Sequence, residues 1–253
     1  MNRSFRYGDG IFESIRVFNG KMPFLDRHWR RLSAGMQALR LEAPPHFTQA
    51  FFKEKTLKTI ENQGNWRVRL IVFRSGGGLY TPEKNEADFL IEASPLAADN
   101  FEWQTEGLHV GICETVKLTP SIFSPFKTCS ALPFVLAGIF KKENRLDDCL
   151  LLNQTGRIVC GGSSNLFLVE NGRLFTPPIS EGCVAGVIRS AVLDVAKALK
   201  IKVKEAKIPT RCLAQADEIF LTNAVQGIRW VRQLKGMEKT FTCKTASLIL
   251  EKL

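Results

Sequence analysis

The chain has 253 residues, 45% of them hydrophobic and 24% charged, which is ordinary for a globular protein that buries a sizeable core. No apolar run is long enough to cross a membrane, the seven cysteines form no C-x-x-C pair, and the three histidines lack metal-ligand spacing. We therefore expect a cytoplasmic protein without a metal site or a disulfide framework.

The formal net charge of +10 is the unusual feature of the composition. Such a charge attracts anions, which could be nucleic acids, phosphate-bearing cofactors or carboxylate substrates, or it could serve solubility alone. No array of basic and aromatic residues accompanies the charge. The sequence therefore favours a small-molecule partner over nucleic acid or a membrane.

The N-terminal part of the chain predicts a strand followed by two helices. RYGDGIFE at 6–13 is a glycine-bracketed turn that runs into a strand, Ile11–Val17, which ends at Asn19-Gly20. We expect Asp26 to cap a helix with one apolar face, and a second helix to cover Thr48–Gln63. The apolar face of the first helix comprises Leu25, Trp29, Leu32, Met36 and Leu39.

Two further strands flank a glycine-rich turn. Trp66–Phe73 and Asp88–Ala93 have the residue types of strands that enter a core, and Ser75–Gly78 lies between them. The turn lacks the G-x-x-x-x-G-K-[ST] pattern of a phosphate loop, so it predicts either a flexible hairpin or the rim of an active site. From Ser94 to Gly107 the chain is polar and without periodicity, as in an interdomain linker.

The second half of the chain is richer in strands. A strand at Leu108–Cys113 leads to a loop around Lys127 and then to a helix over Ser130–Lys142. Gly182 and Gly186 open a later helix, whose apolar face comprises Val184, Ile188, Ala191, Val195 and Leu199. The other expected strands are Cys149–Leu152, Arg157–Cys160, Leu166–Val169, Leu174–Thr176, Lys202–Glu205 and Glu218–Thr222, and a final helix starts near Thr245.

Strands and helices follow one another without a regular βαβ rhythm and without an internal repeat. We therefore predict an α+β fold in two domains. A small N-terminal domain occupies 1–98, a linker occupies 99–106, and a larger C-terminal domain occupies 107–253.

Lys127 is the strongest candidate for chemistry. Most lysines are solvated charges or ion-pair partners, because an ammonium group is costly to bury. Lys127, however, follows Pro125-Phe126 and leads into an apolar run from Ala131 to Phe140. Burial favours the neutral amine, which is the form that condenses with an aldehyde.

Three other features could converge with Lys127, although each is weak alone. CGGSSN at 160–165 follows a strand and suits close backbone approach to a ligand, but an ordinary turn explains it equally well. Gly186-Val187-Ile188 stands at a helix N-terminus, where N–H groups and the helix dipole favour a phosphate. Arg31, on the first helix, is either a phosphate ligand or a solvated surface charge.

Six segments carry motifs that occur together in one enzyme family. They are YGDGIFESIRV at 7–17, HWRRLSAG at 28–35, Lys127, IVCGGSSNLFLV at 158–169, GCVAGVIR at 182–189 and ADEIFLTNAVQGIRWV at 216–231. In this order, over nearly the whole chain, they resemble the class-IV aminotransferases. These are fold-type-IV pyridoxal-phosphate enzymes, and they include branched-chain and D-amino-acid aminotransferases and 4-amino-4-deoxychorismate lyase. The family usually has about one more strand before its YGDG motif, so the resemblance also suggests a short or truncated start.

The resemblance implies a cofactor and a role for individual residues. Lys127 would hold pyridoxal 5'-phosphate covalently and then move the proton at the substrate α-carbon. Arg31 would grip the cofactor phosphate, helped by the backbone N–H groups of Val187 and Ile188 and by the Asn223-Ala224 turn. Relatives of this kind are homodimers, so the resemblance implies a homodimer as well.

The ring site holds the main departure from the family. Ser163 and Asn165 would support the pyridine ring, but the glutamate that pairs with the ring nitrogen in the family falls on Cys160. A carboxylate there keeps the nitrogen protonated and strengthens the electron sink, whereas a neutral thiol does so weakly. Either Cys160 acts as a thiolate, or the ring works less protonated, or the site is degraded. Positions that set substrate choice also differ from close relatives: Ser130, Phe134 and Leu79.

Two activities share this chemistry. An aminotransferase needs a pocket for an amino acid and its 2-oxo acid partner, whereas the lyase expels pyruvate from a bulky aminated cyclohexadiene. Thr222-Asn223-Ala224 is closer to the lyase pattern, while Leu79 stands where lyases often carry arginine. We expect an aminotransferase, with the lyase as the alternative. A third reading is a protein that binds the cofactor without turnover, because Cys160 replaces the glutamate.

Overall fold

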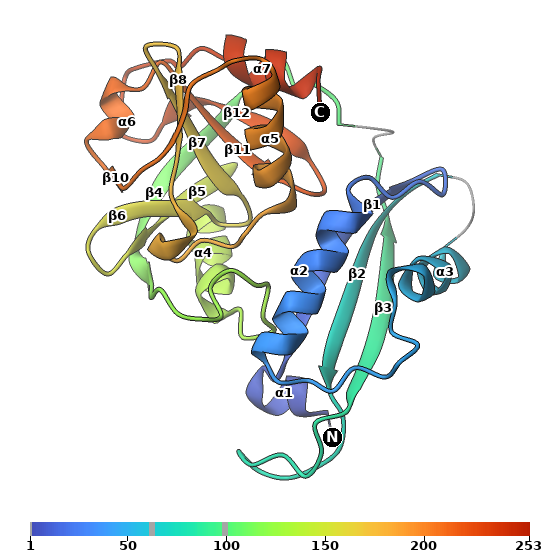
Figure 1. Cartoon of the computed structure of the whole chain (residues 1–253). Coiled ribbons are helices and arrows are strands. Elements are labelled where there is room, and N and C mark those ends of the chain that lie inside the picture. The colour runs from blue at the N-terminus through green and yellow to red at the C-terminus, as the bar shows by residue number, and fades with distance from the viewer. Residues whose placement is uncertain (1, 61–63, 98–100) are drawn as a thin grey trace. The chain divides into compact units, whose positions relative to one another are not determined.

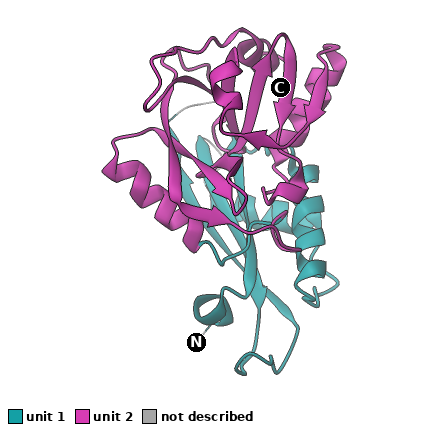
Figure 2. Ribbon diagram, turned by 90° about the vertical axis from the view of Figure 1, so that its left-hand side faces the viewer, with its two compact units in different colours: residues 1–100, 126–131 teal, residues 101–125, 132–253 magenta. Residues whose placement is uncertain are grey.

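The computed structural model describes residues 2–60, 64–97 and 101–253. Their contacts separate the chain into two units, coloured teal and magenta in Figure 2: residues 1–100 with 126–131, and residues 101–125 with 132–253. The segment 126–131, which contains Lys127, thus groups with the N-terminal residues. The first residues of the predicted linker, 99 and 100, and the predicted end of the second helix, 61–63, lie outside the described residues.

The N-terminal unit is a three-stranded antiparallel sheet with helices beside it (Figure 1). Its strands lie in the order β1 (Gly10–Phe18), β2 (Asn65–Arg74) and β3 (Ala87–Pro95), and its helices are α1 (Arg3–Tyr7), α2 (Leu25–Ala38) and α3 (Gln49–Thr59). One apolar cluster joins the sheet to the helices. It includes Ile11 and Leu70 from the strands, Leu32 and Met36 from α2, and Phe52 from α3. The predicted apolar face of α2 therefore packs on the sheet.

Both helix predictions in this unit need correction at one end. The residue before α2 is Phe24, in a left-handed conformation with a φ of 58°, and Asp26 lies within the first turn instead of capping it. An acidic side chain is favourable there because it faces the positive end of the helix dipole. α3 is capped by Thr48, which accepts a hydrogen bond from the Phe51 amide at 3.1 Å. It ends at Thr59 because the backbone of Ile60 is extended.

The C-terminal unit is built on a nine-stranded sheet of mixed direction. The strand order is β10-β6-β5-β4-β12-β11-β7-β8-β9, and β12–β4, β4–β5 and β8–β9 pair in parallel. The strands are β4 (Leu108–Leu118), β5 (Asp148–Asn153), β6 (Arg157–Gly161), β7 (Asn165–Glu170), β8 (Arg173–Thr176), β9 (Val203–Glu205), β10 (Ile208–Pro209), β11 (Glu218–Asn223) and β12 (Gly227–Leu234). The helices are α4 (Leu132–Glu143), α5 (Val187–Ala198), α6 (Cys212–Gln215) and α7 (Lys244–Leu250), with a 3-10 turn at Ile179–Glu181.

This mixed arrangement confirms the predicted α+β class. The start of α5 and the presence of β12 are among the details that differ from prediction. Gly182, with a φ of 106°, ends the 3-10 turn, and α5 begins only after Gly186, so Val184 lies outside the helix. β12 has no predicted counterpart, because arginine and glutamine interrupt its apolar residues in GIRWVRQL.

Candidate active site

Lys127 is held on the N-terminal unit by backbone pairing with β1. The Phe12 amide donates to the Lys127 carbonyl at 2.8 Å, and the Cys129 amide donates to the Gly10 carbonyl at 2.8 Å. An isolated antiparallel bridge joins Ile11 to Thr128 between these two bonds. The loop that carries Lys127 is thus fixed along the edge of β1 opposite β2.

The Lys127 side chain lies among apolar and cationic groups. Its Nζ is 4.6 Å from the centroid of the Phe12 ring, and the Arg69 guanidinium carbon is 3.8 Å from the same centroid. Burial lowers the pKa of Lys127, and the charge of Arg31 lowers it further. Glu13 opposes these effects, Arg69 and Arg67 add to them, and the resulting pKa is about 8. The amine is therefore much closer to its neutral form than an ordinary lysine.

Arg31 is held in place by a buried carboxylate. Its Nε donates to Glu13 Oε1 at 2.8 Å and its Nη2 donates to Oε2 at 2.6 Å, so the pair is bidentate. His28 Nδ1 lies 2.6 Å from the same Oε2, and Glu13 is only 2% exposed. Burial raises the pKa of Glu13, but the charge and hydrogen bonds of Arg31, together with His28, outweigh burial and bring it to about 2. The bidentate pair therefore fixes the orientation of the Arg31 guanidinium.

Glu13 and His28 are functional candidates that the sequence analysis did not select. Glu13 stands in the first motif, and its side chain alternates with that of Phe12 along β1. His28 and Arg31 are three residues apart on α2, which places them on one side of the helix. The sequence therefore contained a signal for these two residues: a glutamate in a strand, followed by a helix with the pattern H-x-x-R.

Cys160 lies on β6 in the C-terminal unit, opposite Leu151 of β5. It is 4% exposed and belongs to an apolar cluster. The same cluster contains three other cysteines, Cys113, Cys149 and Cys183. Cys160, the residue expected at the position of the family's glutamate, thus lies in apolar packing.

Asp148 shapes the turn that follows Cys160, and the sequence analysis missed it. Asp148 Oδ1 accepts hydrogen bonds from the amides of Cys149 at 2.8 Å and Gly162 at 3.2 Å, and Oδ2 accepts one from Ser164 Oγ at 3.1 Å. A Cβ at Gly161 would overlap the Ser164 hydroxyl, so a larger residue there would displace the hydroxyl from Asp148. Burial raises the pKa of Asp148. Ser163, the residue selected from the sequence, is exposed, and Ser164 makes the contact with Asp148.

Asn165 connects β7 to the start of α5. Its Nδ2 donates to the Val184 carbonyl at 2.9 Å, and its Oδ1 occupies the place that a Cβ of Gly186 would take. α5 follows Gly186 without a side-chain cap, and Val187 and Ile188 in its first turn are buried. Asn165 therefore positions a helix N-terminus of the kind that binds phosphate.

Replacing Gly186 by alanine is expected to destabilise the protein by about 1–3 kcal/mol, because the new methyl group must displace the Asn165 carboxamide. Chemical denaturation measures the effect. Gly138→Ala is the matched control, since nothing lies within 4 Å of a Cβ there and the residue is inside α4. Equal stabilities of the two variants would contradict the expectation.

The remaining candidates close the turn between β11 and β12. Asn223 Oδ1 accepts hydrogen bonds from the amides of Val225 at 3.0 Å and Gln226 at 2.8 Å. Ala224, inside this turn, contributes only backbone groups and a methyl group. The candidates thus fall into two sets. Arg31 and Lys127 lie in the N-terminal unit, and the C-terminal unit contains Cys160, Ser163, Asn165, Val187, Ile188, Asn223 and Ala224.

Comparison with known proteins identifies the family. A family model described as amino-transferase class IV matches residues 10–234. The chain belongs to this family. Among the relatives of this class IV chain is a Methanocaldococcus jannaschii protein, provisionally named a branched-chain-amino-acid aminotransferase. It is 30% identical over 91% of this chain and 80% of its own length.

Solved structures confirm the predicted fold-type-IV architecture of the class IV chain. The 4-amino-4-deoxychorismate lyase from Pseudomonas aeruginosa is 30% identical, with a TM-score of 0.85 over 98% of this chain and 91% of that one. An aminotransferase from Brucella abortus bound to the co-factor PLP has the same fold, with 20% identity and a TM-score of 0.84 over 99% of this chain and 91% of that one. Both an aminotransferase name and a lyase name thus occur among the relatives.

Proposed function

We propose that this class IV family member is an aminotransferase that uses pyridoxal 5'-phosphate (PLP) and acts on an amino acid and a 2-oxo acid. The observation that carries the proposal is Lys127, a partly buried amine with a pKa of about 8. An aldehyde condenses with a neutral amine, and such an amine is rare on a protein surface. We also propose a homodimer, as the resemblance implies, and a cytoplasmic location, as the scattered cysteines indicate.

The side chains fit a phosphorylated aldehyde. Lys127 suits the aldehyde, and the Arg31 guanidinium, oriented by Glu13, suits the phosphate dianion. The uncapped start of α5 suits further phosphate oxygens, which we assign to the amides of Val187 and Ile188. We assign the same role to the turn at Asn223 and Ala224. The residues assigned to the surroundings of the pyridine ring are Cys160, Ser163 and Asn165.

The protein itself would bind and orient the cofactor and the substrate, and would move a proton between them. When bound, PLP supplies an electron sink for the negative charge at the substrate α-carbon. Neutral Lys127 would accept the proton from that carbon, a role that suits a group whose pKa is near the working pH. As a neutral thiol, Cys160 would hold a proton on the ring nitrogen more weakly than a glutamate does. We therefore expect slower turnover than in relatives that have the carboxylate.

A 4-amino-4-deoxychorismate lyase is the second candidate. It is favoured by Ala224, which offers no hydroxyl in the turn closed by Asn223, and by the 30% identity to a solved lyase. Leu79, where lyases often have arginine, does not favour it.

Turnover of two substrate sets distinguishes the candidates. Purified protein with PLP is given L-leucine and 2-oxoglutarate, and L-glutamate is measured; other amino donors follow. A parallel reaction contains aminodeoxychorismate, and p-aminobenzoate and pyruvate are measured. The proposal expects L-glutamate with at least one donor. Release of p-aminobenzoate alone would establish the lyase, and a borohydride-stable covalent adduct without either product would indicate a non-catalytic binder.

A further inference from the structure

Three elements of the N-terminal unit meet at Gly35, a residue of α2 that has no side chain. Gly35 is buried, and a Cβ built there would lie 2.9 Å from Ile11 Cδ1 of β1 and 3.3 Å from the Phe126 ring. Both distances are shorter than favourable carbon–carbon contacts, which are about 3.5–4.0 Å. The Phe126 ring therefore occupies space that any larger residue at position 35 would need.

This contact lies beside both candidate residues of the unit. Phe126 directly precedes Lys127 in the chain. Gly35 follows Arg31 by four residues, which is about one turn of α2, so the two residues lie on the same side of the helix. The contacts agree with this, because Arg31 binds Glu13 of the strand that Gly35 touches. Phe126 on Gly35 thus connects the segment that carries the amine to the helix that carries the guanidinium.

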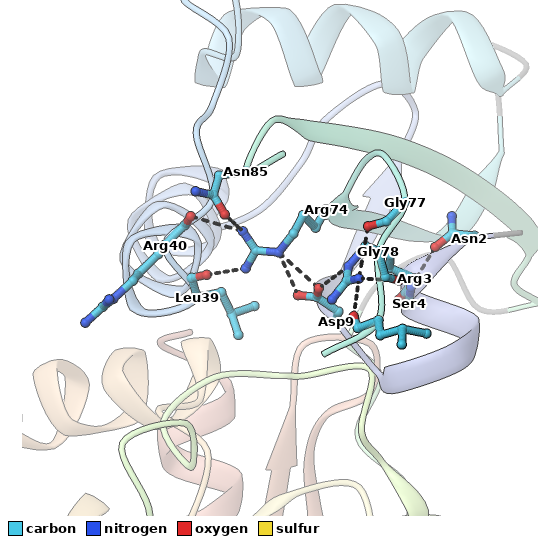
Figure 3. Close-up of polar contacts among 11 residues, drawn as sticks. Asn2, Arg3, Ser4, Asp9, Leu39, Arg40, Arg74, Gly77, Gly78 and Asn85 are labelled. Carbon is cyan, nitrogen blue, oxygen red and sulfur yellow. Dashed lines mark hydrogen bonds and ion pairs between the residues drawn. The ribbon is translucent and has the colours of Figure 1, made fainter. Parts of the chain in front are cut away.

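The C-terminal end of α2 is anchored separately (Figure 3). Arg74 Nη2 donates to the Leu39 carbonyl at 2.6 Å, and Arg74 Nε donates to Asp9 Oδ2 at 3.0 Å. Asp9 directly precedes β1, and Arg74 is the last residue of β2. Hydrogen bonds with charged partners are stronger than neutral ones. The helix is therefore held to the sheet by Glu13 and by Arg74, and it forms a fixed support for the Phe126 ring.

The side to which Lys127 points depends on how its segment pairs with β1. Along such pairing, neighbouring side chains point to opposite sides, and a slip of one residue would exchange the two sides. The Phe126 ring is on the side of α2. Lys127 accordingly points to the other side, where its Nζ is 4.6 Å from the centroid of the Phe12 ring.

Other contacts hold the segment 126–131 without deciding this side. Its hydrogen bonds to Gly10 and Phe12 involve main-chain atoms, so they do not depend on which side chains face α2. The contact with Gly8 is similar, since a Cβ there would lie 3.0 Å from the Ser130 amide nitrogen. Phe126 adds a large side chain whose fit against α2 depends on the register.

We infer that Phe126 is a positioning residue: its ring, packed on Gly35, fixes the register of the segment 126–131 on β1. The Lys127 amine is thereby held at a set separation from the Arg31 guanidinium. The inference rests on the proposed function, in which one phosphorylated aldehyde binds both groups. A misplacement of about 1 Å lowers a rate by about 10²-fold, so such a pair of groups needs a rigid support.

The test measures the pKa of Lys127 without PLP. The full chain is treated with acetic anhydride over a range of pH, acetylation of Lys127 is quantified by peptide mass spectrometry, and the wild type should give a midpoint near 8. In Phe126→Ala the midpoint should rise by about one pH unit, because the amine becomes less buried and less influenced by Arg31. The rate of PLP capture at pH 8 should fall about tenfold. Phe126→Leu should lie between the wild type and Phe126→Ala in both measurements.

Phe123→Ala is the matched control. It removes the same ring three residues earlier, from a side chain that is 39% exposed, and it should leave the midpoint and the capture rate unchanged. All variants retain the charged groups that act on the Lys127 amine, which are Arg31, Glu13, Arg69 and Arg67.

Gly35→Ala tests the same contact from the helix, and it carries the test if Phe126→Ala does not fold. The new methyl group should displace the Phe126 ring and raise the labelling midpoint of Lys127. Adding Phe126→Leu to Gly35→Ala should bring the midpoint back towards 8, because the smaller side chain makes room for the methyl group. Such recovery shows that the two positions act through one contact.

Each outcome decides the inference. An unmoved midpoint in Phe126→Ala, or an equal shift in Phe123→Ala, would overturn it. A lower melting temperature with an unmoved midpoint would show a merely structural role, which also overturns it, as would a Gly35→Ala shift that Phe126→Leu does not reverse. If the wild type fails to capture PLP, the proposed function fails instead, and the labelling midpoints alone decide whether Phe126 positions Lys127.

Discussion

Replacing Lys127 by alanine is expected to abolish covalent capture of PLP and to lower turnover by about 10³-fold or more. The amine has two roles in the proposed reaction, nucleophile and proton carrier, and proton transfer alone is worth about 10²–10⁴-fold. Capture is measured by mass spectrometry after borohydride reduction, and turnover by product formation. Both measurements use the full chain with added PLP.

Two comparisons make this expectation specific to Lys127. Lys58→Ala removes an exposed lysine that pairs with Glu54 at 2.5 Å, and it should leave capture and turnover unchanged. In the wild type, the rate of capture should rise with pH through about 8, the pKa of Lys127, because only the neutral amine reacts. An adduct on another lysine in Lys127→Ala, with turnover retained, would refute the assignment.

The helices and strands could be predicted from the sequence where the local signals are strong. Turn signals at both ends predicted β1, strand-forming residues predicted β2, and the apolar stripe predicted α2. The first and last residues of the helices were harder to predict. Asp26 is a residue type that often caps helices, but Phe24 occupies the N-cap position of α2. A favourable residue type does not decide which residue adopts the non-helical conformation.

The candidate site was predictable as a set of motifs but not as a set of contacts. Lys127 could be selected from its apolar neighbours, yet its pairing with β1 joins residues more than a hundred positions apart. Asp148 was missed for the same reason, because its partners Gly162 and Ser164 lie on another segment and no local pattern links them. Hydrogen bonds between distant segments depend on strand register, which the sequence leaves open.

Replacing Glu13 by glutamine is expected to destabilise the protein by about 3–5 kcal/mol, since it leaves Arg31 buried without its counter-charge. Denaturant unfolding at pH 7 measures the change. Glu54→Gln is the matched control, because Glu54 pairs with Lys58 at an exposed position, and it should change stability little. Stability equal to the wild type in Glu13→Gln would contradict a central role for this carboxylate.

The pH dependence separates the charge of Glu13 from its shape. The folded pKa of Glu13 is about 2, below its ordinary value of 4.5, so its ionisation stabilises the folded protein above pH 4.5. This contribution, on the order of 3 kcal/mol, is lost as the pH falls from 4.5 towards 2, and the gap between wild type and Glu13→Gln should shrink over that range. Because Glu13 also raises the pKa of Lys127, the glutamine variant should shift the pH midpoint of PLP capture below 8. A stability gap that stays constant down to pH 2, together with an unmoved midpoint, would mean that Glu13 acts by packing and not by charge.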